Sequence, residues 1–140
     1  MNEKVAVIGL GYVGLPLAVE FGKTRPTIGF DINSKRVEEL REGCDRTREV
    51  DAAELREAKH LSFSSALADL RQCRFFIVAV PTPVDNANRP DLSILDEASR
   101  TVGQAMGNAA NNATLAQQQG GTLYLAVAAT GCALIYAQKP

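Results

Sequence analysis

Short apolar runs alternate along this chain with stretches in which apolar residues recur every three or four positions. Runs without polar alternation predict strands that are buried on both faces, and the three- or four-residue spacing predicts helices. Strands are expected at residues 4–8, 27–31, 61–63, 75–80 and 122–128, and helices at 12–23, 34–43, 51–59, 65–71 and 93–106. Asn33 or Ser34 and Ser93 are expected to cap two of these helices. This alternation predicts an α/β fold with a doubly wound parallel sheet of five strands, ordered 3-2-1-4-5 and lacking a complete sixth strand.

The first apolar run leads directly into glycines at the spacing G-x-G-x-x-G, followed at once by a helical pattern. Gly9 permits a tight turn, Gly11 has no Cβ to keep phosphates away, and Gly14 lets the helix pack closely on the strand. A pyrophosphate is bound well by bare backbone N–H groups at a helix N-terminus. Strand, glycine turn and helix therefore predict a Rossmann-type dinucleotide-binding fold. The alternative is a tight strand-to-helix turn that binds nothing.

An acidic residue closes the second apolar run. Asp31 is expected at the carboxyl end of that strand, where its carboxylate accepts hydrogen bonds from both adenosine ribose hydroxyls and repels the 2′-phosphate of NADP. This favours NAD as the cofactor, although the basic pair Lys35 and Arg36 weakens the preference. The alternatives are a helix cap or loop acid for Asp31 and a solvated helix charge for Arg36.

The strand at residues 75–80 is ended by two prolines, which cannot donate to a strand ladder. The residue between them, Thr82, is expected at the carboxyl edge of the sheet, facing the cofactor crevice. The alternative is a plain turn residue between Pro81 and Pro83.

Composition narrows the functional class. The 140 residues are 46% apolar, with a formal net charge of −1, which argues against nucleic-acid and membrane-surface binding. Three cysteines, Cys44, Cys73 and Cys132, form no metal motif, and reduced thiols in a cytoplasmic protein are expected. The apolar run near the C-terminal end is short for a membrane span and is interrupted at residues 130–131. An uncovered sheet edge is expected to favour self-association.

Three signatures, within residues 7–17, 29–37 and 78–92, together resemble one family. They read VIGLGYVGLPL, then GFDIN followed by RV, then VAVPTPVD with PDL. Over residues 4–106 the chain resembles the N-terminal, NAD-binding domain of the UDP-glucose/GDP-mannose dehydrogenase family. Within that family it looks most like the bacterial UDP-N-acetylhexosamine 6-dehydrogenases of surface polysaccharide synthesis.

The resemblance implies an enzyme family that oxidises C6 of a nucleotide sugar twice, using two NAD per product. The alcohol becomes an aldehyde, and the aldehyde becomes a carboxylate through a cysteine thiohemiacetal. It also implies that Tyr12 and Val13 lie against the pyrophosphate through their backbone, that Asp31 and Arg36 hold the adenosine ribose, and that Thr82 approaches the nicotinamide half. The predicted cofactor site comprises Gly9, Gly11, Tyr12, Val13, Gly14, Asp31, Ile32, Arg36, Pro81 and Thr82, with no catalytic residue and no metal site.

The chain departs from the family after residue 107. Where the family carries Glu-Ser-Thr-Val-x-Pro-Gly, residues 124–131 place Leu125 and Val127 at the positions of the polar pair. Cys132 lacks the glycine-rich context of the family's nucleophile. The expected domains are a Rossmann domain at 1–107 and an atypical segment at 108–140, a linker plus one further strand. The resemblance therefore predicts NAD binding without turnover, with a UDP-sugar bound only in an intact enzyme. The alternatives are a stand-alone nucleotide-binding or redox-sensing module and an inactive truncated fragment.

Overall fold

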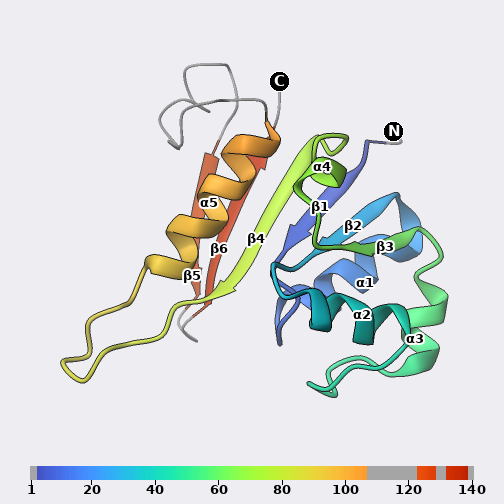
Figure 1. The fold of residues 1–140 in the computed structure, drawn as a ribbon, viewed down its shortest axis with the longest axis horizontal. Coiled ribbons are helices and arrows are strands. Elements are labelled where there is room, and N and C mark those ends of the chain that lie inside the picture. The colour runs from blue at the N-terminus through green and yellow to red at the C-terminus, as the bar shows by residue number, and fades with distance from the viewer. Residues whose placement is uncertain (1–2, 107–122, 129–131, 139–140) are drawn as a thin grey trace.

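The computed structural model describes residues 3–106, 123–128 and 132–138, which form one six-stranded sheet with helices packed on both faces (Figure 1). The elements in chain order are β1 (Val5–Ile8), α1 (Gly14–Thr24), β2 (Thr27–Phe30), α2 (Ser34–Arg41), α3 (Ala52–Glu57), β3 (Leu61–Ser64), α4 (Leu67–Leu70), β4 (Phe75–Pro81), α5 (Ser93–Ala105), β5 (Leu123–Ala128) and β6 (Cys132–Gln138). No helix in this described part of the chain is long and apolar enough to cross a bilayer.

Four parallel strands form the part of the sheet that agrees with the predicted strand order. Their order is β3-β2-β1-β4, so β1 lies between β2 and β4, with Val5 in register with Thr27 on one side and Phe75 on the other. This order brings the carboxyl ends of β1, β2 and β4 to one edge of the sheet. The parallel α/β arrangement expected from the alternating pattern is confirmed.

The prediction of a fifth parallel strand beside β4 is wrong. The neighbour of β4 is β6, which runs antiparallel to it from the pair Phe75–Gln138 to the pair Pro81–Cys132, and β5 lies outermost. The physical reason is that the last apolar run of the sequence forms two strands, β5 and β6, instead of one. β5 runs in the same direction as β4, and β6 folds back into the space between them, where its backbone satisfies the hydrogen-bonding edge of β4. Most of the predicted linker lies outside the described residues.

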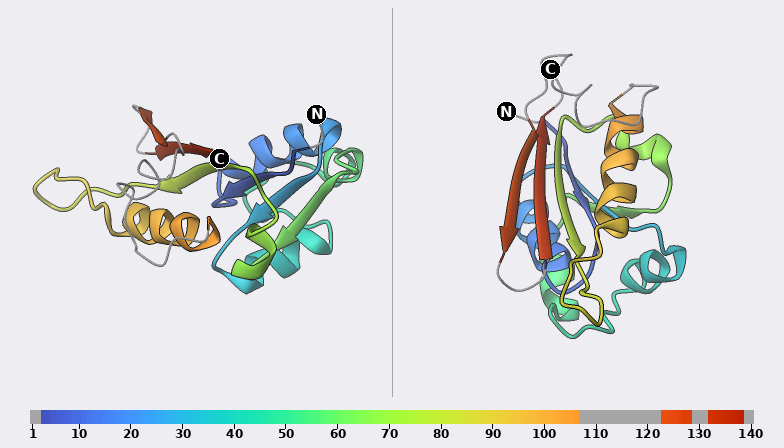
Figure 2. Two further views of the ribbon diagram at one scale, coloured as in Figure 1. Left: turned by 90° about the horizontal axis from the view of Figure 1, so that it is seen from above. Right: turned by 90° about the vertical axis from the view of Figure 1, so that its left-hand side faces the viewer.

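The core is divided by the sheet into two layers. Helix α1 covers one face, and α4 and α5 cover the other (Figure 2). Because successive side chains on a strand point to opposite faces, Val5 and Val7 pack in the α1 layer, whereas Ala6 and Ile8 pack in the α5 layer. All four residues of β1 are buried, as the unbroken apolar run predicts.

The starts of two helices test the predicted caps. Asn33 caps α2, since its side-chain oxygen accepts the backbone N–H groups of Lys35 and Arg36. The prediction for Ser93 is wrong, because Ser93 is the first residue of α5 and its own N–H donates to a carboxylate oxygen of Asp91 over 2.9 Å. The acid two residues earlier offers the stronger, charged acceptor.

Candidate functional site

The glycine turn that follows β1 is held by contacts between main-chain atoms. Gly9 has a φ of +94°, and its N–H donates to the carbonyl of Phe30 over 2.8 Å. A Cβ on Gly14 would lie 1.7 Å from the carbonyl oxygen of Gly9, and a Cβ on Gly9 would lie 2.4 Å from that of Ala79 on β4. The turn, the start of α1 and the end of β4 therefore approach more closely than any side chain would allow.

The start of α1 carries no group that would compete with an anion. The residue before the helix, Val13, makes no side-chain capping bond, and the first turn contains no acid. A Cβ on Gly11 would meet nothing within 4 Å. The space in front of Gly11 is therefore open, beside a helix N-terminus whose dipole favours negative charge.

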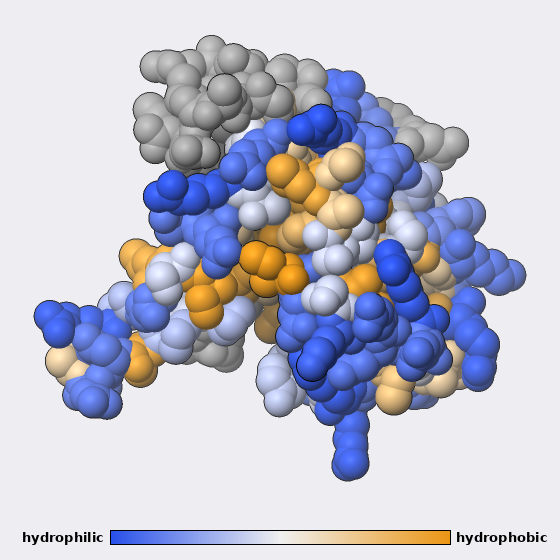
Figure 3. Space-filling view, viewed as in Figure 1, coloured by the Kyte–Doolittle hydropathy of each residue, from blue (hydrophilic) through white to orange (hydrophobic). Residues whose placement is uncertain are grey.

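A pocket of about 310 Å³ opens at this edge of the sheet. In the space-filling view, apolar residues gather in the middle of this face, between α5 and α2 (Figure 3). The pocket is lined by Ile8, Gly9, Leu10, Gly11, Phe30, Asp31, Ile32, Asn33, Arg36, Arg46, Thr47, Ala79, Val80, Pro81, Ile94, Glu97, Ala98 and Thr101. An apolar cleft with a few convergent polar groups is the usual form of a small-molecule site.

Asp31 lies at the rim of this pocket, directly after β2, and is half-buried. One carboxylate oxygen accepts the N–H of Leu10 over 3.0 Å and the other accepts the N–H of Asn33 over 2.9 Å. A carboxylate offers about four acceptor positions, so each oxygen retains capacity for one further donor. Asp31 therefore fixes its own loop and still presents two acceptors to a ligand.

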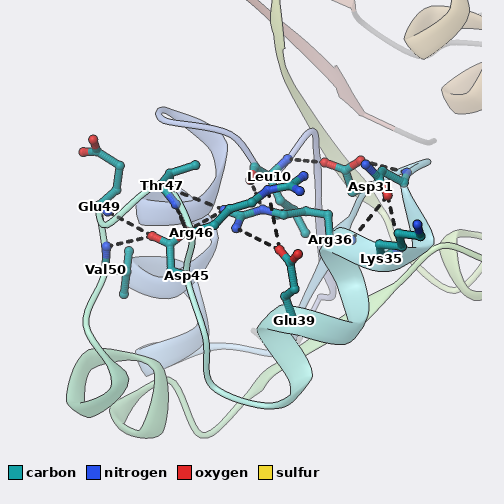
Figure 4. Close-up of polar contacts among 11 residues, drawn as sticks. Leu10, Asp31, Lys35, Arg36, Glu39, Asp45, Arg46, Thr47, Glu49 and Val50 are labelled. Atoms are coloured by element: carbon teal, nitrogen blue, oxygen red, sulfur yellow. Dashed lines mark hydrogen bonds and ion pairs between the residues drawn. The ribbon is translucent and has the colours of Figure 1, made fainter.

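Arg36 is buried, with 3% of its surface exposed, so the alternative of a solvated helix charge is wrong. Its Nε donates to the carbonyl of Leu10 over 2.9 Å, and its Nη2 donates to Asp45 over 2.7 Å (Figure 4). Its Nη1 is buried and makes no hydrogen bond to any residue in the described part of the chain. The nearest acid, Glu39, has its Oε2 at 4.0 Å, too far for a hydrogen bond. Arg36 therefore keeps one N–H group without a hydrogen bond, facing Glu39 Oε2, which is likewise buried and makes no hydrogen bond.

Asp45 organises the loop between α2 and α3. Its carboxylate accepts hydrogen bonds from Arg36, from the backbone and hydroxyl of Thr47, and from the backbone N–H groups of Glu49 and Val50. Burial raises the pKa of this carboxyl, but the bonds from Thr47, Arg36 and the backbone outweigh that effect and bring the pKa to about 2. Asp45 therefore stays ionised and holds the loop through its charge.

The structure brings six of the ten predicted cofactor residues into the pocket wall, namely Gly9, Gly11, Asp31, Ile32, Arg36 and Pro81. The other four lie beside it in the chain and do not line it. Tyr12 and Val13 are 69% and 45% exposed, Gly14 is buried under the turn, and Thr82 is half-buried just beyond Pro81.

Sequence reasoning missed the two walls that come from elsewhere in the chain. Arg46 and Thr47 come from the loop between α2 and α3, and Ile94, Glu97 and Thr101 come from α5. The spacing Asp-x-Thr in a polar loop is a usable signal, because such side chains often bond the backbone two residues on. Nothing in the spacing of α5 indicated which of its residues face a ligand.

The described residues contain no group of three or more His, Cys, Asp or Glu side chains that could hold a metal ion. Two thiols are free, with Cys44 exposed and Cys73 buried. Burial raises the pKa of the Cys73 thiol to about 11, so it is protonated near neutral pH and a poor nucleophile.

Acid should weaken the fold through Asp45. Because its pKa falls from an ordinary 3.8 to about 2 on folding, its stabilising effect is complete above pH 3.8 and is lost as the pH falls through about 2. The difference in free energy of unfolding between the wild type and Asp45→Asn should therefore shrink by about 2 kcal/mol between pH 5 and pH 2. Urea unfolding at several pH values measures this, and a difference that does not change with pH contradicts it.

Comparison with known proteins identifies the family. The model of the NAD-binding domain of the UDP-glucose/GDP-mannose dehydrogenase family matches residues 3–115. A second family model, described as RebB, killing trait, matches residues 95–139 and so overlaps the first. The chain is 61% identical over 103 residues to a UDP-N-acetyl-D-glucosamine 6-dehydrogenase of Pseudomonas aeruginosa and 52% identical over 103 residues to that of Salmonella typhi.

These matches cover 74% of this chain, which spans about a quarter of the length of the curated relatives it matches. Among solved structures, the UDP-D-ManNAc dehydrogenase of Pyrococcus horikoshii is similar with a TM-score of 0.67 at 34% identity, over 73% of this chain and 25% of that one. The sheet order, the glycine turn and these matches agree, and the chain belongs to the UDP-glucose/GDP-mannose dehydrogenase family, as its NAD-binding domain.

Proposed function

We propose that the pocket at the carboxyl ends of β1, β2 and β4 is where this domain binds NAD, with the pyrophosphate on the glycine turn. The observation that carries the proposal is the bare main chain at Gly11, which lies in front of an uncapped and acid-free start of α1. Phosphate oxygens need backbone N–H groups at short range, and this is the position that offers them. Tyr12 and Val13 would contribute through their backbone.

The adenosine ribose would lie between Asp31 and Arg36. Asp31 retains an acceptor on each carboxylate oxygen for the two ribose hydroxyls, and Nη1 of Arg36 is a buried donor that makes no hydrogen bond in the described chain, with the Glu39 carboxylate 4.0 Å away. These two side chains face the same pocket. The apolar Ile32 at the rim and the α5 residues on the opposite wall suit an adenine ring.

The nicotinamide half would extend past Pro81 toward Thr82, at the end of β4. Bound NAD supplies the hydride acceptor for oxidation of an alcohol. The residues of this chain would bind and orient the cofactor.

We propose that the substrate of the intact enzyme is a UDP-N-acetylhexosamine, oxidised at C6 to a uronic acid. This rests on the relatives from Pseudomonas aeruginosa and Salmonella typhi, which are named UDP-N-acetyl-D-glucosamine 6-dehydrogenases. A cytoplasmic location is proposed as well, because Cys44 and Cys73 are free thiols.

We further propose that the chain has two parts, a Rossmann domain at 1–107 and a segment of different origin at 108–140. The second family match, over 95–139, supports this division, as does the antiparallel β6 beside β4. The outer edge of β5 ends the sheet, whereas the opposite edge at β3 is partly covered, since Arg41 donates twice to the carbonyl of Phe63. The outer edge of β5, which pairs with no other strand in the described part of the chain, suits pairing between two copies of the chain.

Self-association through β5 predicts a mass that depends on concentration. Light scattering should give twice the monomer mass at high protein concentration, and Leu125→Lys should return the chain to a monomer, because a charge on an edge strand opposes pairing. Leu92→Lys, at an exposed position before α5, serves as the control and should leave the mass unchanged. A wild type that stays monomeric at every concentration contradicts the proposal.

The pyrophosphate position is tested by Gly11→Ala. The new methyl group has room in the free domain, so the melting temperature should not change. It would occupy the space proposed for the phosphates and should weaken NADH binding by about 1–3 kcal/mol, or about five- to 150-fold. Gly103→Ala in α5 also has open space at its Cβ and should bind NADH normally. Calorimetric titration measures both, and wild-type affinity in Gly11→Ala would place the cofactor elsewhere.

Binding without turnover is the expected behaviour of these 140 residues alone. Cys73 is protonated and buried, and the segment at β5 has Leu125 and Val127 where the family motif is polar. Incubation with NAD and UDP-N-acetylglucosamine or UDP-N-acetylgalactosamine should therefore produce NADH no faster than a blank without protein. Formation of NADH well above that blank would show that the catalytic groups are present.

A further inference from the structure

The residue between the first two glycines of the turn is held from both sides by charged side chains. The N–H of Leu10 donates to Asp31 over 3.0 Å, and its carbonyl accepts from Nε of Arg36 over 2.9 Å. Leu10 is 1% exposed, and the glycines on either side of it have no side chains to restrain them. These two bonds therefore fix the peptide orientation at the entrance of the turn (Figure 4).

The bond from Arg36 to the Leu10 carbonyl depends on a further residue, Asp45, which also bonds the guanidinium. The Arg36–Asp45 pair is almost completely enclosed, with 3% and 0% of the two side chains exposed. The other acid near the guanidinium, Glu39, is 4.0 Å from Nη1 and 36% exposed. Without Asp45, the buried guanidinium would have no close acid and would be drawn toward Glu39, away from its present orientation.

Asp45 also affects the pocket through the loop between α2 and α3. The bonds it accepts from the backbone of Thr47, Glu49 and Val50 set the course of the loop between α2 and α3. That loop brings Arg46 and Thr47 to the pocket wall. The same carboxylate thus determines where the loop lies and how Arg36 is oriented.

We propose that Asp45 is a positioning residue for the cofactor, which acts through Arg36 on the Leu10 peptide of the glycine turn and through the loop on the adenosine wall. Asp45 itself does not line the pocket. The inference rests on the proposed function, because the ligand it concerns is NAD. It adds a residue about 14 positions beyond the acid at the end of β2 to the groups that determine affinity.

A purely local role for Asp45 makes a different prediction. If Asp45 only stabilised its own loop, its loss would lower the melting temperature and leave the turn after β1 unaffected. If it acts through Arg36, its loss must also appear at Leu10, whose own acceptor Asp31 is unchanged. The two roles are separated by measurements on the glycine turn.

The first measurement is NADH affinity in Asp45→Asn, Arg36→Met and the double variant. Asp45→Asn should weaken binding about tenfold, a usual effect of losing a residue that orients a binding group. In the Arg36→Met background the same change should weaken binding clearly less than tenfold, because the guanidinium that Asp45 orients is gone and only its effect through the loop remains. The control is Asp51→Ala, which removes an exposed acid that caps α3 and should lower stability while leaving NADH affinity unchanged.

The second measurement is amide hydrogen exchange in the ligand-free chain. Asp45→Asn should speed exchange at Leu10 several-fold in addition to exchange at Glu49 and Val50, whereas Asp51→Ala should affect only the start of α3. Unchanged exchange at Leu10, or full and independent effects of Asp45→Asn and Arg36→Met on affinity, would overturn the proposal. A wild type that fails to bind NADH would instead refute the proposed function, and exchange at Leu10 would still decide whether Asp45 positions the turn.

Discussion

The close approach of main chain to main chain at the end of β1 is the constraint on which the rest of the site depends. The space between the carbonyl of Gly9 and the start of α1 would not admit even a methyl group on Gly14. This contact fixes where the helix begins and aims its N-terminal amides past Gly11. The pocket exists because the carboxyl ends of β2 and β4 lie on either side of this turn in a parallel sheet.

Beside that turn, the protein buries a pair of charged side chains at a place where apolar packing is more usual. Arg36 and Asp45 form an enclosed ion pair, and such pairs contribute little net stability against well-packed apolar residues. The pair matters here because it sets the orientation of the Arg36 guanidinium, whose N–H donors point at fixed angles. One nitrogen holds the Leu10 carbonyl, a second holds Asp45, and a third lies 4.0 Å from Glu39 without a hydrogen bond. The interaction therefore specifies a site more than it stabilises a fold.

Local patterns in the sequence were sufficient to predict the parallel half of the fold. The four parallel strands, the glycine turn and the acid after β2 each follow from a run of a few residues. The order of the last two strands did not follow. The apolar run within residues 122–137 is interrupted at 130–131, but nothing in it says that the second part turns back beside β4. The burial of Arg36 was also missed, since its partner Asp45 belongs to a loop whose course depends on that same contact.

The cofactor's place on the main chain is the central claim, and a crystal structure of the chain with NADH tests it most directly. Density for the pyrophosphate is expected against Gly11 and the first amides of α1, with the adenosine ribose between Asp31 and Nη1 of Arg36. An empty turn, or NADH bound at a site that does not include Gly11, would contradict the account.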